Sequence, residues 1–290
     1  MVKKMKFMLG GIGNWYNDFG RVKKGILEAD KLGFYGAVMP DHYMWGEMHG
    51  GMMSRSDSNV TMETWITLAY LAAKTEQIHL GTMVTPIPFR PPGLVAKMIS
   101  TLDILSNGRV IAGIGAGWSQ VEFEGYSEWN KSKMRVDKTF EGLDLILQLW
   151  TKDEVDFEGK FYKAKGAVLE PKPIQKPYPK LLFGSRGTRM LELSGTYGDI
   201  IYLPPFGGYD PLEARKTVML AAEKANRTDK VGFMTGGMGS GNISDTDEIM
   251  KIIGSAKDTG DKYYMVSLPR DESGIDAIRK FAKEVMPSFK

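Results

Sequence analysis

Eight short apolar runs rich in β-forming residues recur along the 290-residue chain, separated by stretches with helical periodicity. The runs span residues 6–10, 34–39, 78–85, 110–115, 181–184, 200–203, 231–235 and 263–268. Most are continuously apolar, which is typical of parallel strands buried on both faces. After the first run, Phe19, Val22, Ile26 and Ala29 recur every three or four residues, the spacing of one helix face. Each strand–helix unit averages about 36 residues, which predicts an α/β fold, a single-domain (β/α)8 TIM barrel over residues 1–290; a doubly wound open sheet is the alternative.

One segment, residues 151–179, does not follow this alternation of strands and helices. Residues 157–162 read Phe-Glu-Gly-Lys-Phe-Tyr, and residues 170–179 contain four prolines, which forbid a regular helix. We therefore predict a small hairpin followed by an extended crossing, inserted after the fourth helix of the barrel and belonging to the same domain.

Composition excludes several classes of protein. The 38 Lys and Arg residues nearly balance 35 Asp and Glu residues and alternate with them along most of the chain, so a nucleic-acid-binding surface is disfavoured. The absence of cysteine excludes disulfides, thiolate nucleophiles, iron–sulfur clusters and cysteine zinc sites. No run approaches the roughly 20 apolar residues of a membrane helix, and glycines interrupt the apolar N-terminal segment, unlike a signal peptide. We expect a cytoplasmic protein with no nucleic-acid or membrane partner.

Candidate catalytic groups are sorted by their place on the barrel, because catalytic side chains project from the C-terminal ends of its strands. His42 follows the second strand and is the best candidate for acid–base chemistry. His79 begins the third strand, at the opposite end, where a structural role is expected, and His49 lies in a long loop. No pair of histidines has the spacing of metal ligands, so no metal site is predicted.

Two glycine-rich turns follow predicted strands. Residues 113–117 read Gly-Ile-Gly-Ala-Gly and continue with Trp118, so they do not match the dinucleotide-binding pattern; Ala116 and Gly117 form a turn where a ligand approaches the backbone. Residues 184–189 read Gly-Ser-Arg-Gly-Thr-Arg and lead into a helix, an arrangement suited to a phosphate. The alternative for this second turn is a flexible loop with surface arginines.

Three tryptophans follow the first, second and fourth strands and should line the mouth of the barrel beside His42. They are Trp15, Trp45 and Trp118. A wall of indole rings suits a flat conjugated ligand, although each tryptophan alone is more often a packing residue.

Several motifs in the same order resemble the bacterial-luciferase-like superfamily of flavin and deazaflavin oxidoreductases, nearer to its coenzyme F420-dependent branch. They lie at residues 80–92, 100–110, 113–118, 135–137, 157–162 and 197–199. The first reads Leu-Gly-Thr-Met-Val-Thr-Pro-Ile-Pro-Phe-Arg-Pro-Pro, and the third reads Gly-Ile-Gly-Ala-Gly-Trp. The resemblance covers the chain through the sixth strand.

The resemblance implies a tricyclic cofactor at the C-terminal mouth of the barrel. Asp41 and His42 look like the pair that deazaflavin enzymes place beside the reacting ring, with His42 moving the substrate proton and Asp41 orienting the ring or the histidine. Met83 and Val84 occupy the family position of a non-prolyl cis peptide that supports the ring. The phosphate is implied to bind Gly184, Ser185, Arg186 and Gly187, while Trp15, Trp45 and Trp118 shape the substrate pocket.

The implied reaction is hydride transfer between F420 and a small organic substrate, either an alcohol–carbonyl pair or a one-carbon imine. F420 is favoured over FMN because the chain is short and because of the Asp41–His42 pair. The alternatives are an FMNH2-dependent monooxygenase that uses O2 and a partner flavin reductase, a non-catalytic flavin-binding protein and, outside the family, a phosphate-handling lyase or isomerase. Trp118 stands where the sugar-phosphate dehydrogenases of the branch have an acidic residue, which puts glucose-6-phosphate oxidation in doubt. A homodimer is expected.

Overall fold

The computed structural model describes residues 4–12, 18–44, 61–204, 207–237, 243, 245–267 and 274–289. Parallel strands in these ranges close into a barrel, because β3 pairs with β5 and completes the sheet order β3-β2-β1-β11-β10-β9-β8-β5-β4. The strands are β1 Lys6–Gly10, β2 Gly36–Met39, β3 His79–Thr82, β4 Thr85–Pro86, β5 Val110–Gly115, β8 Lys180–Gly184, β9 Ile200–Tyr202, β10 Gly232–Gly236 and β11 Tyr263–Ser267. Since β4 continues β3 after a short break, the barrel has eight strand positions, and the (β/α)8 prediction is confirmed.

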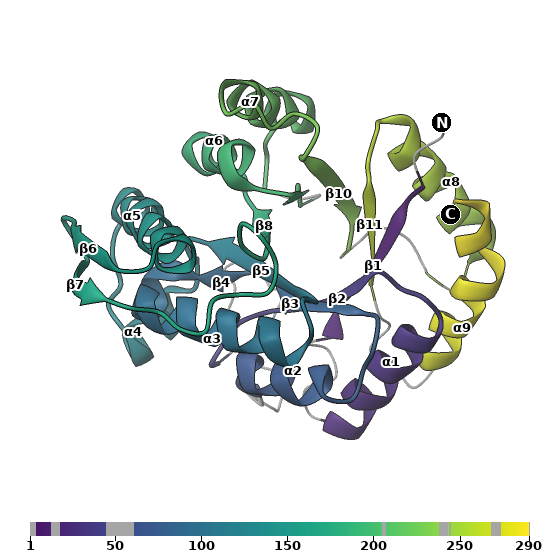
Figure 1. Ribbon diagram of the computed structural model, residues 1–290. Helices are drawn as coiled ribbons and strands as arrows, with labels where there is room; N and C mark the ends of the chain where they lie inside the picture. Colours follow the sequence, from purple (N-terminus) through teal and green to yellow (C-terminus); the bar gives the residue numbers. More distant parts are fainter. Residues whose placement is uncertain are drawn as a thin grey trace.

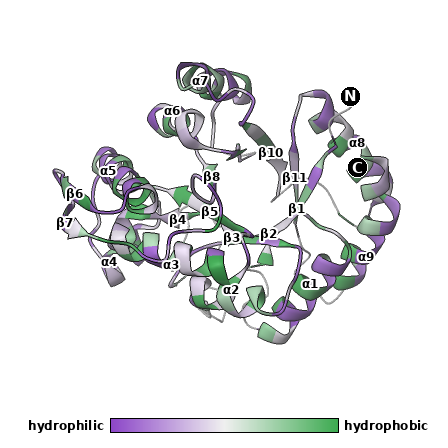
Figure 2. Cartoon of the chain, viewed as in Figure 1, coloured by the Kyte–Doolittle hydropathy of each residue, from purple (hydrophilic) through white to green (hydrophobic). Residues whose placement is uncertain are grey.

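Helices surround the barrel, as Figure 1 shows. They are α1 Phe19–Lys31, α2 Thr64–Ala72, α3 Pro92–Leu105, α4 Gln120–Tyr126, α5 Ser132–Thr151, α6 Thr188–Tyr197, α7 Pro211–Lys224, α8 Thr246–Asp258 and α9 Gly274–Glu284, with short 3-10 helices η2 Ile87–Phe89 and η3 Met286–Ser288. Helix α1 buries the predicted face of Val22, Ile26 and Ala29, and its N-terminus is capped by Asp18, whose carboxylate accepts the N–H of Arg21 at 3.1 Å. Hydrophilic residues colour the outer helices, such as α7 and α9, whereas β5 is largely hydrophobic (Figure 2).

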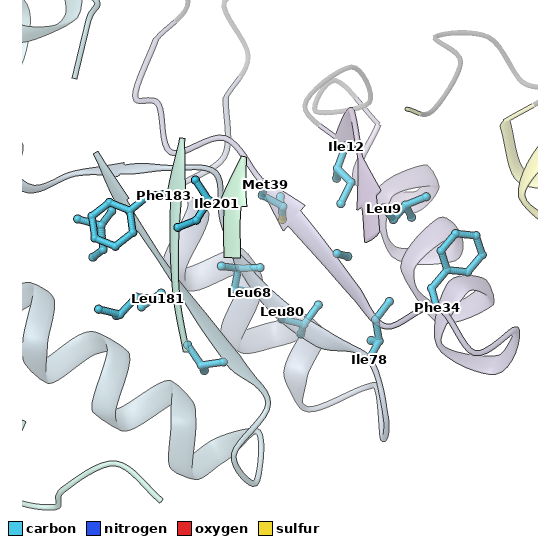
Figure 3. Packing of buried hydrophobic residues seen from close by; sticks show 14 of the residues in the cluster. Leu9, Ile12, Phe34, Met39, Leu68, Ile78, Leu80, Leu181, Phe183 and Ile201 are labelled. Atoms are coloured by element: carbon cyan, nitrogen blue, oxygen red, sulfur yellow. The ribbon is translucent and has the colours of Figure 1, made fainter. Parts of the chain in front are cut away.

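The apolar core has two layers, because successive side chains of a strand point to opposite faces of the sheet. On β1, Met8 belongs to the inner cluster, while Phe7 and Leu9 belong to the outer one. The inner cluster consists of Met8, Val38, Ile111, Leu182, Ile200, Tyr202, Met234, Tyr263 and Met265. The outer layer lies between strands and helices, where Figure 3 shows Leu9, Phe34, Leu80, Phe183 and Ile201. Side chains therefore fill the barrel, and a ligand must bind at an end or on the outside.

The predicted hairpin is present in the insertion. Strands β6 Val155–Glu158 and β7 Lys163–Ala167 pair antiparallel beside α5. The Glu141 carboxylate of α5 accepts the backbone N–H groups of Phe161 and Tyr162, each at 2.7 Å, and so ties the turn of the hairpin to the helix. The two ends of the chain also meet, because the N–H of Met5 donates to the carbonyl of Phe289 at 2.9 Å. Within the described ranges, no helix has the length and apolar character needed to cross a membrane.

Candidate functional site

His42 lies just after β2, at the C-terminal end of the barrel, and pairs with a carboxylate from a distant part of the chain. Its Nδ1 lies 2.8 Å from Oε2 of Glu122, a residue of α4 that is 80 positions away and only 2% exposed. The other oxygen of Glu122 accepts the backbone N–H of Tyr43. One buried carboxylate thus fixes both the ring and the backbone of the His42 segment. When the carboxylate holds the imidazole proton at Nδ1, proton exchange with a ligand takes place at Nε2.

Glu122 was not among the residues singled out from the sequence. A weak signal existed, because Glu122 lies four residues after Trp118 at the mouth, where α4 presents its side chain back toward the barrel. Nothing in the local sequence links this carboxylate to His42, since the contact exists only after the barrel closes.

Asp41 points away from His42 into a buried polar cluster. Its carboxylate binds Arg90 through two hydrogen bonds of 2.8 Å each and also accepts from Thr85 Oγ1 at 2.8 Å and Trp65 Nε1 at 3.2 Å. Burial alone would lower the pKa of the Arg90 guanidinium. The negative charge and the hydrogen bonds of Asp41 outweigh this effect and raise the pKa. A catalytic role for Asp41 stays a prediction; its contacts make it an anchor of the segment that carries His42.

The rest of this segment is held from α2 and from the loop before it. Thr64 Oγ1 donates to the carbonyl of Pro40 at 2.8 Å, and Thr61 Oγ1 donates to the carbonyl of Tyr43 at 2.6 Å. The ring of Tyr43 lies 4.7 Å from the Arg90 guanidinium, and burial raises the pKa of its hydroxyl. The backbone beside His42 is therefore rigidly placed, which is what a proton-transfer group requires.

Trp118 is the predicted pocket tryptophan that the structure describes, and it lies beside His42. The two ring centres are 5.5 Å apart with an interplanar angle of 66°, and Trp118 is 46% exposed. Gly117 before it adopts a φ of 76° and leaves no room for a side chain against Phe123, so glycine is required at this turn. Trp15, Trp45 and His49 lie outside the described residues.

Met83 and Val84 are joined by a cis peptide bond between β3 and β4. Both side chains are half-buried and pack on top of the inner barrel cluster. Val84 reaches across to the neighbouring strands, because a Cβ atom at Gly115 would clash with it and one at Gly184 would lie 3.6 Å away. Ala116, also half-buried, packs against the outer core. These residues make a floor at the mouth of the barrel on which a flat ring fits.

The turn after β8 has the features of an anion site. Ser185 is 4% exposed, and its hydroxyl has no hydrogen-bond partner among the described residues. Helix α6 starts directly after Gly187, and no side chain caps its first N–H groups. A Cβ atom at Gly187 would meet no described residue within 4 Å. A buried hydroxyl without a described partner, next to an uncapped helix N-terminus, fits the phosphate of a cofactor.

The two arginines of this turn have different surroundings. Arg186 is exposed and lies against Gly207, close to the turn. Arg189 instead forms an ion pair of 2.6 Å with Asp137 of α5 and lies over the ring of Phe140 at 5.1 Å. Arg186 thus lies beside the turn, while Arg189 ties α6 to α5.

His79 lies at the opposite end of the barrel, as the sequence predicted. Its ring stacks on Tyr35 with centres 4.4 Å apart, and its Nδ1 lies 3.1 Å from the Tyr35 carbonyl oxygen. Burial, with the positive charge of Lys180, lowers the pKa of His79 to about 4. The imidazole is therefore neutral near pH 7 and has a structural role. In the described ranges, no group of three His, Asp or Glu side chains could hold a metal ion.

A filled barrel with half-buried apolar side chains, a histidine–carboxylate pair and a turn suited to an anion at one end has the architecture of oxidoreductases that bind a flavin-like ring. Residues 7–245 match the luciferase-like monooxygenase family, and the chain belongs to this family.

Relatives in the family use different cofactors. An F420-dependent glucose-6-phosphate dehydrogenase of Microbacterium testaceum is 31% identical over 173 residues, which cover 59% of this chain and 48% of that enzyme. An FMNH2-dependent dimethylsulfone monooxygenase of Pseudomonas putida is 29% identical over 136 residues, which cover 46% of this chain and 37% of that enzyme. The alignments thus span about half the length of these curated relatives or less.

Solved structures share the fold over almost the whole chain. An F420-dependent secondary alcohol dehydrogenase in complex with an F420–acetone adduct superimposes with a TM-score of 0.80 at 18% identity and 99% coverage of both chains. The oxygenating constituent of 3,6-diketocamphane monooxygenase of Pseudomonas putida, in complex with FMN, gives 0.76 at 16% identity and 99% coverage of both. At these identities the likeness concerns the fold.

Proposed function

We propose that this protein is an F420-dependent oxidoreductase that transfers a hydride between F420 and a small organic substrate, of the alcohol–carbonyl or one-carbon imine type. The observation that carries the proposal is the His42–Glu122 pair beside half-exposed Trp118, above the floor formed by Met83 and Val84. Relatives named as F420-dependent enzymes support the choice of cofactor.

The bound deazaflavin supplies the hydride chemistry. Met83 and Val84 would support its ring, while the Ser185 hydroxyl, Arg186 and the N-terminus of α6 would hold its phosphate. His42 would hydrogen-bond the substrate oxygen or nitrogen through Nε2 and take up or release its proton there. Glu122 would keep the ring of His42 in place through Nδ1, and Trp118 would exclude water from the pocket.

The test replaces His42 by Ala. We expect the variant to bind F420 with unchanged Kd, measured by fluorescence titration, and to lose about 100-fold or more in kcat with a panel of small alcohols, followed by F420 absorbance. Turnover at the parental rate in the variant would remove His42 from the mechanism and overturn the assignment.

A second candidate is an FMNH2-dependent monooxygenase supplied by a partner flavin reductase. The relative from Pseudomonas putida that uses FMNH2 supports it, because its identity to this chain is similar to that of the F420-dependent enzymes. Titration of the protein with FMN and with F420 separates the two. Preferential binding of FMN, with oxygen uptake that tracks product, would favour the monooxygenase.

The substrate itself is argued from Trp118. Trp118 stands at the chain position where the sugar-phosphate dehydrogenases of the branch have an acidic residue, and its indole ring lies beside His42, so the pocket offers an apolar wall that suits a small organic substrate better than a sugar phosphate. Glucose-6-phosphate, the substrate in the names of several relatives, belongs in the same panel as a direct comparison.

We also propose a homodimer formed through α2 and α3. These neighbouring helices present apolar side chains to the outside: Ile66 and Tyr70 from α2, Leu94 and Leu105 from α3. Sedimentation velocity of the parent protein and of Ile66→Glu tests it, with a shift from dimer to monomer expected. A parent protein that sediments as a monomer at all concentrations would contradict it. A single domain and a cytoplasmic location, both expected from the sequence, stay predictions.

A further inference from the structure

A groove of about 960 Å³ lies on the outer flank of the barrel. It is bordered by the segment that follows β4, the first turns of α3, helix α5 and the hairpin β6–β7, which project together from one side of the barrel in Figure 1. Its described lining includes neither His42, Trp118 nor Ser185, so it is separate from the site at the barrel mouth. A volume of this size is typical of small-molecule sites.

The groove lining contains apolar side chains among polar and charged ones. Leu145 and Leu149 of α5 face the insertion residues Ala164 and Ala167, and Phe89 closes one side. Apolar side chains in a concave site suit the apolar part of a ligand. An occupant therefore needs an apolar body.

The charged side chains in the described lining of the groove are all cationic. Five cationic side chains line it: Arg90, Lys97, Lys138, Lys160 and Lys163. No Asp or Glu is among the described residues that line it, although acidic and basic residues are nearly balanced in the whole chain, 35 to 38. Carboxylates outside the lining neutralise three of these cations, since Arg90 pairs with Asp41, Lys138 with Glu128 and Lys163 with Glu158.

The remaining two ammonium groups, of Lys97 and Lys160, form no salt bridge with any described carboxylate. Lys97 donates to the carbonyl oxygen of Glu170. The Nζ of Lys160 lies 5.1 Å from the ring centre of Phe161, and the Nζ of Lys138 lies 5.9 Å from the same centre. The ammonium groups of Lys138 and Lys160 thus both stand beside the ring of Phe161, at the edge of the groove. An anionic head group would find its counter-charge there.

We propose that this groove is a binding site for an amphipathic carboxylate of the medium-chain fatty-acid class. Its hydrocarbon chain lies over Ala164, Ala167 and Val168, and its carboxylate lies beside Lys160. The groove shares Arg90 and Phe89 with the cluster behind His42, but neither His42 nor Trp118 is among its described lining residues.

The proposal requires a ligand with an apolar chain and a negative charge. Calorimetric titration of the full-length protein tests these two requirements with matched probes, below their micellar concentrations. Decanoate should bind with one site per chain. Octanoate, two methylene groups shorter, should bind about tenfold more weakly, because each buried methylene strengthens binding up to about fourfold. Decyltrimethylammonium, with the same chain and the opposite charge, should bind at least tenfold more weakly than decanoate. Equal affinities of decanoate and decyltrimethylammonium would overturn the proposal.

Two substitutions locate the site. Val168 is 62% exposed, so Val168→Asp adds an acidic residue to the lining without disturbing the core and should weaken decanoate binding at least tenfold. Lys160→Gln should weaken it several-fold. The matched controls are Leu220→Asp and Lys216→Gln on α7, which are also exposed and should leave binding unchanged.

Two outcomes contradict this location. Decanoate binding that Val168→Asp leaves intact would place the ligand elsewhere, for example at the barrel mouth. If decanoate fails to bind the parent protein and Val168→Asp converts a dimer to a monomer in sedimentation velocity, the groove is covered by a second copy of the chain instead.

Discussion

The two ends of the barrel each hold a histidine, in surroundings of opposite charge. At the C-terminal end, His42 pairs with the buried carboxylate of Glu122 and lies beside half-exposed Trp118. At the N-terminal end, His79 stacks on Tyr35, and burial, with the charges of Lys180 and Lys6, lowers its pKa to about 4. The same side chain is thus a candidate acid–base group at one end and a neutral packing residue at the other.

The two ends of the barrel differ in the side chains that surround the histidine. At the N-terminal end, Lys180 Nζ donates to the Tyr35 hydroxyl at 2.7 Å, and Lys6 Nζ lies 4.4 Å from the centre of the same ring. Burial, with the charges of Lys180 and Lys262, lowers the pKa of Lys6. This end closes the barrel with rings and alkyl chains, whereas the C-terminal end keeps a carboxylate-backed histidine where a ligand can reach it.

The largest expected effect concerns Asp41, the anchor of the C-terminal end. Asp41→Asn leaves the buried Arg90 guanidinium without its bidentate partner and should lower the free energy of unfolding by about 3 kcal/mol, measured by urea denaturation. Asp229→Asn, at an exposed carboxylate, serves as the control and should have no measurable effect. A variant with unchanged stability and a strongly reduced kcat would instead make Asp41 a catalytic residue.

The next prediction tests whether Glu122, the partner of His42, is needed for the reactivity of the C-terminal end of the barrel. Glu122→Gln should lower kcat about 100-fold and change the shape of the pH–rate profile, while the Kd for F420 stays constant. Glu124→Gln changes an exposed neighbour on the same helix and should leave both parameters unaltered. If Glu122→Gln shifts only the unfolding midpoint, the carboxylate is structural and the contrast between the two histidines disappears.

The N-terminal end should reveal its neutral histidine through the pH dependence of stability. The pKa of His79 is lowered from 6.5 to about 4, so the unfolded chain binds the extra proton between these values. The contribution of His79 to the free energy of unfolding is complete above pH 6.5. It decreases by about 2 kcal/mol as the pH falls toward 4, after allowance for partial exposure. Urea denaturation at several pH values measures it. The dependence should be absent in His79→Phe and retained in His42→Phe; the reverse pattern would exchange the roles of the two histidines.

The smallest effect concerns the phosphate turn at the C-terminal end. Ser185→Ala removes a buried donor and should weaken F420 binding about fivefold, the value of one hydrogen bond. Binding of the deazaflavin without its phosphate-bearing side chain should be the same for the variant and the parent. Ser132→Ala, at an exposed position on α5, is the control. Equal losses for both ligands would place Ser185 away from the phosphate.

Some of the site was predictable from the sequence. His42, Trp118 and the turn at 184–187 were expected at strand C-termini, and the structure places them there, because the end of each strand is marked by local sequence. Glu122 was missed, and Asp41, which was expected to orient the cofactor ring or His42, pairs with Arg90. These partners lie 80 and 49 positions away from the residues they bind, and no local pattern encodes such distances.

The sequence by itself determined the eight strand positions, the hairpin of the insertion and the end of the barrel at which chemistry is expected. Each of these follows from hydrophobic periodicity and from turn residues, which act over a few neighbouring positions. Only the tertiary structure decided which carboxylate pairs with which partner, which histidine stays neutral and that five cations line one groove. Burial and electrostatics depend on side chains that the closure of the barrel brings together, and their sum is fixed by distance in space rather than along the chain.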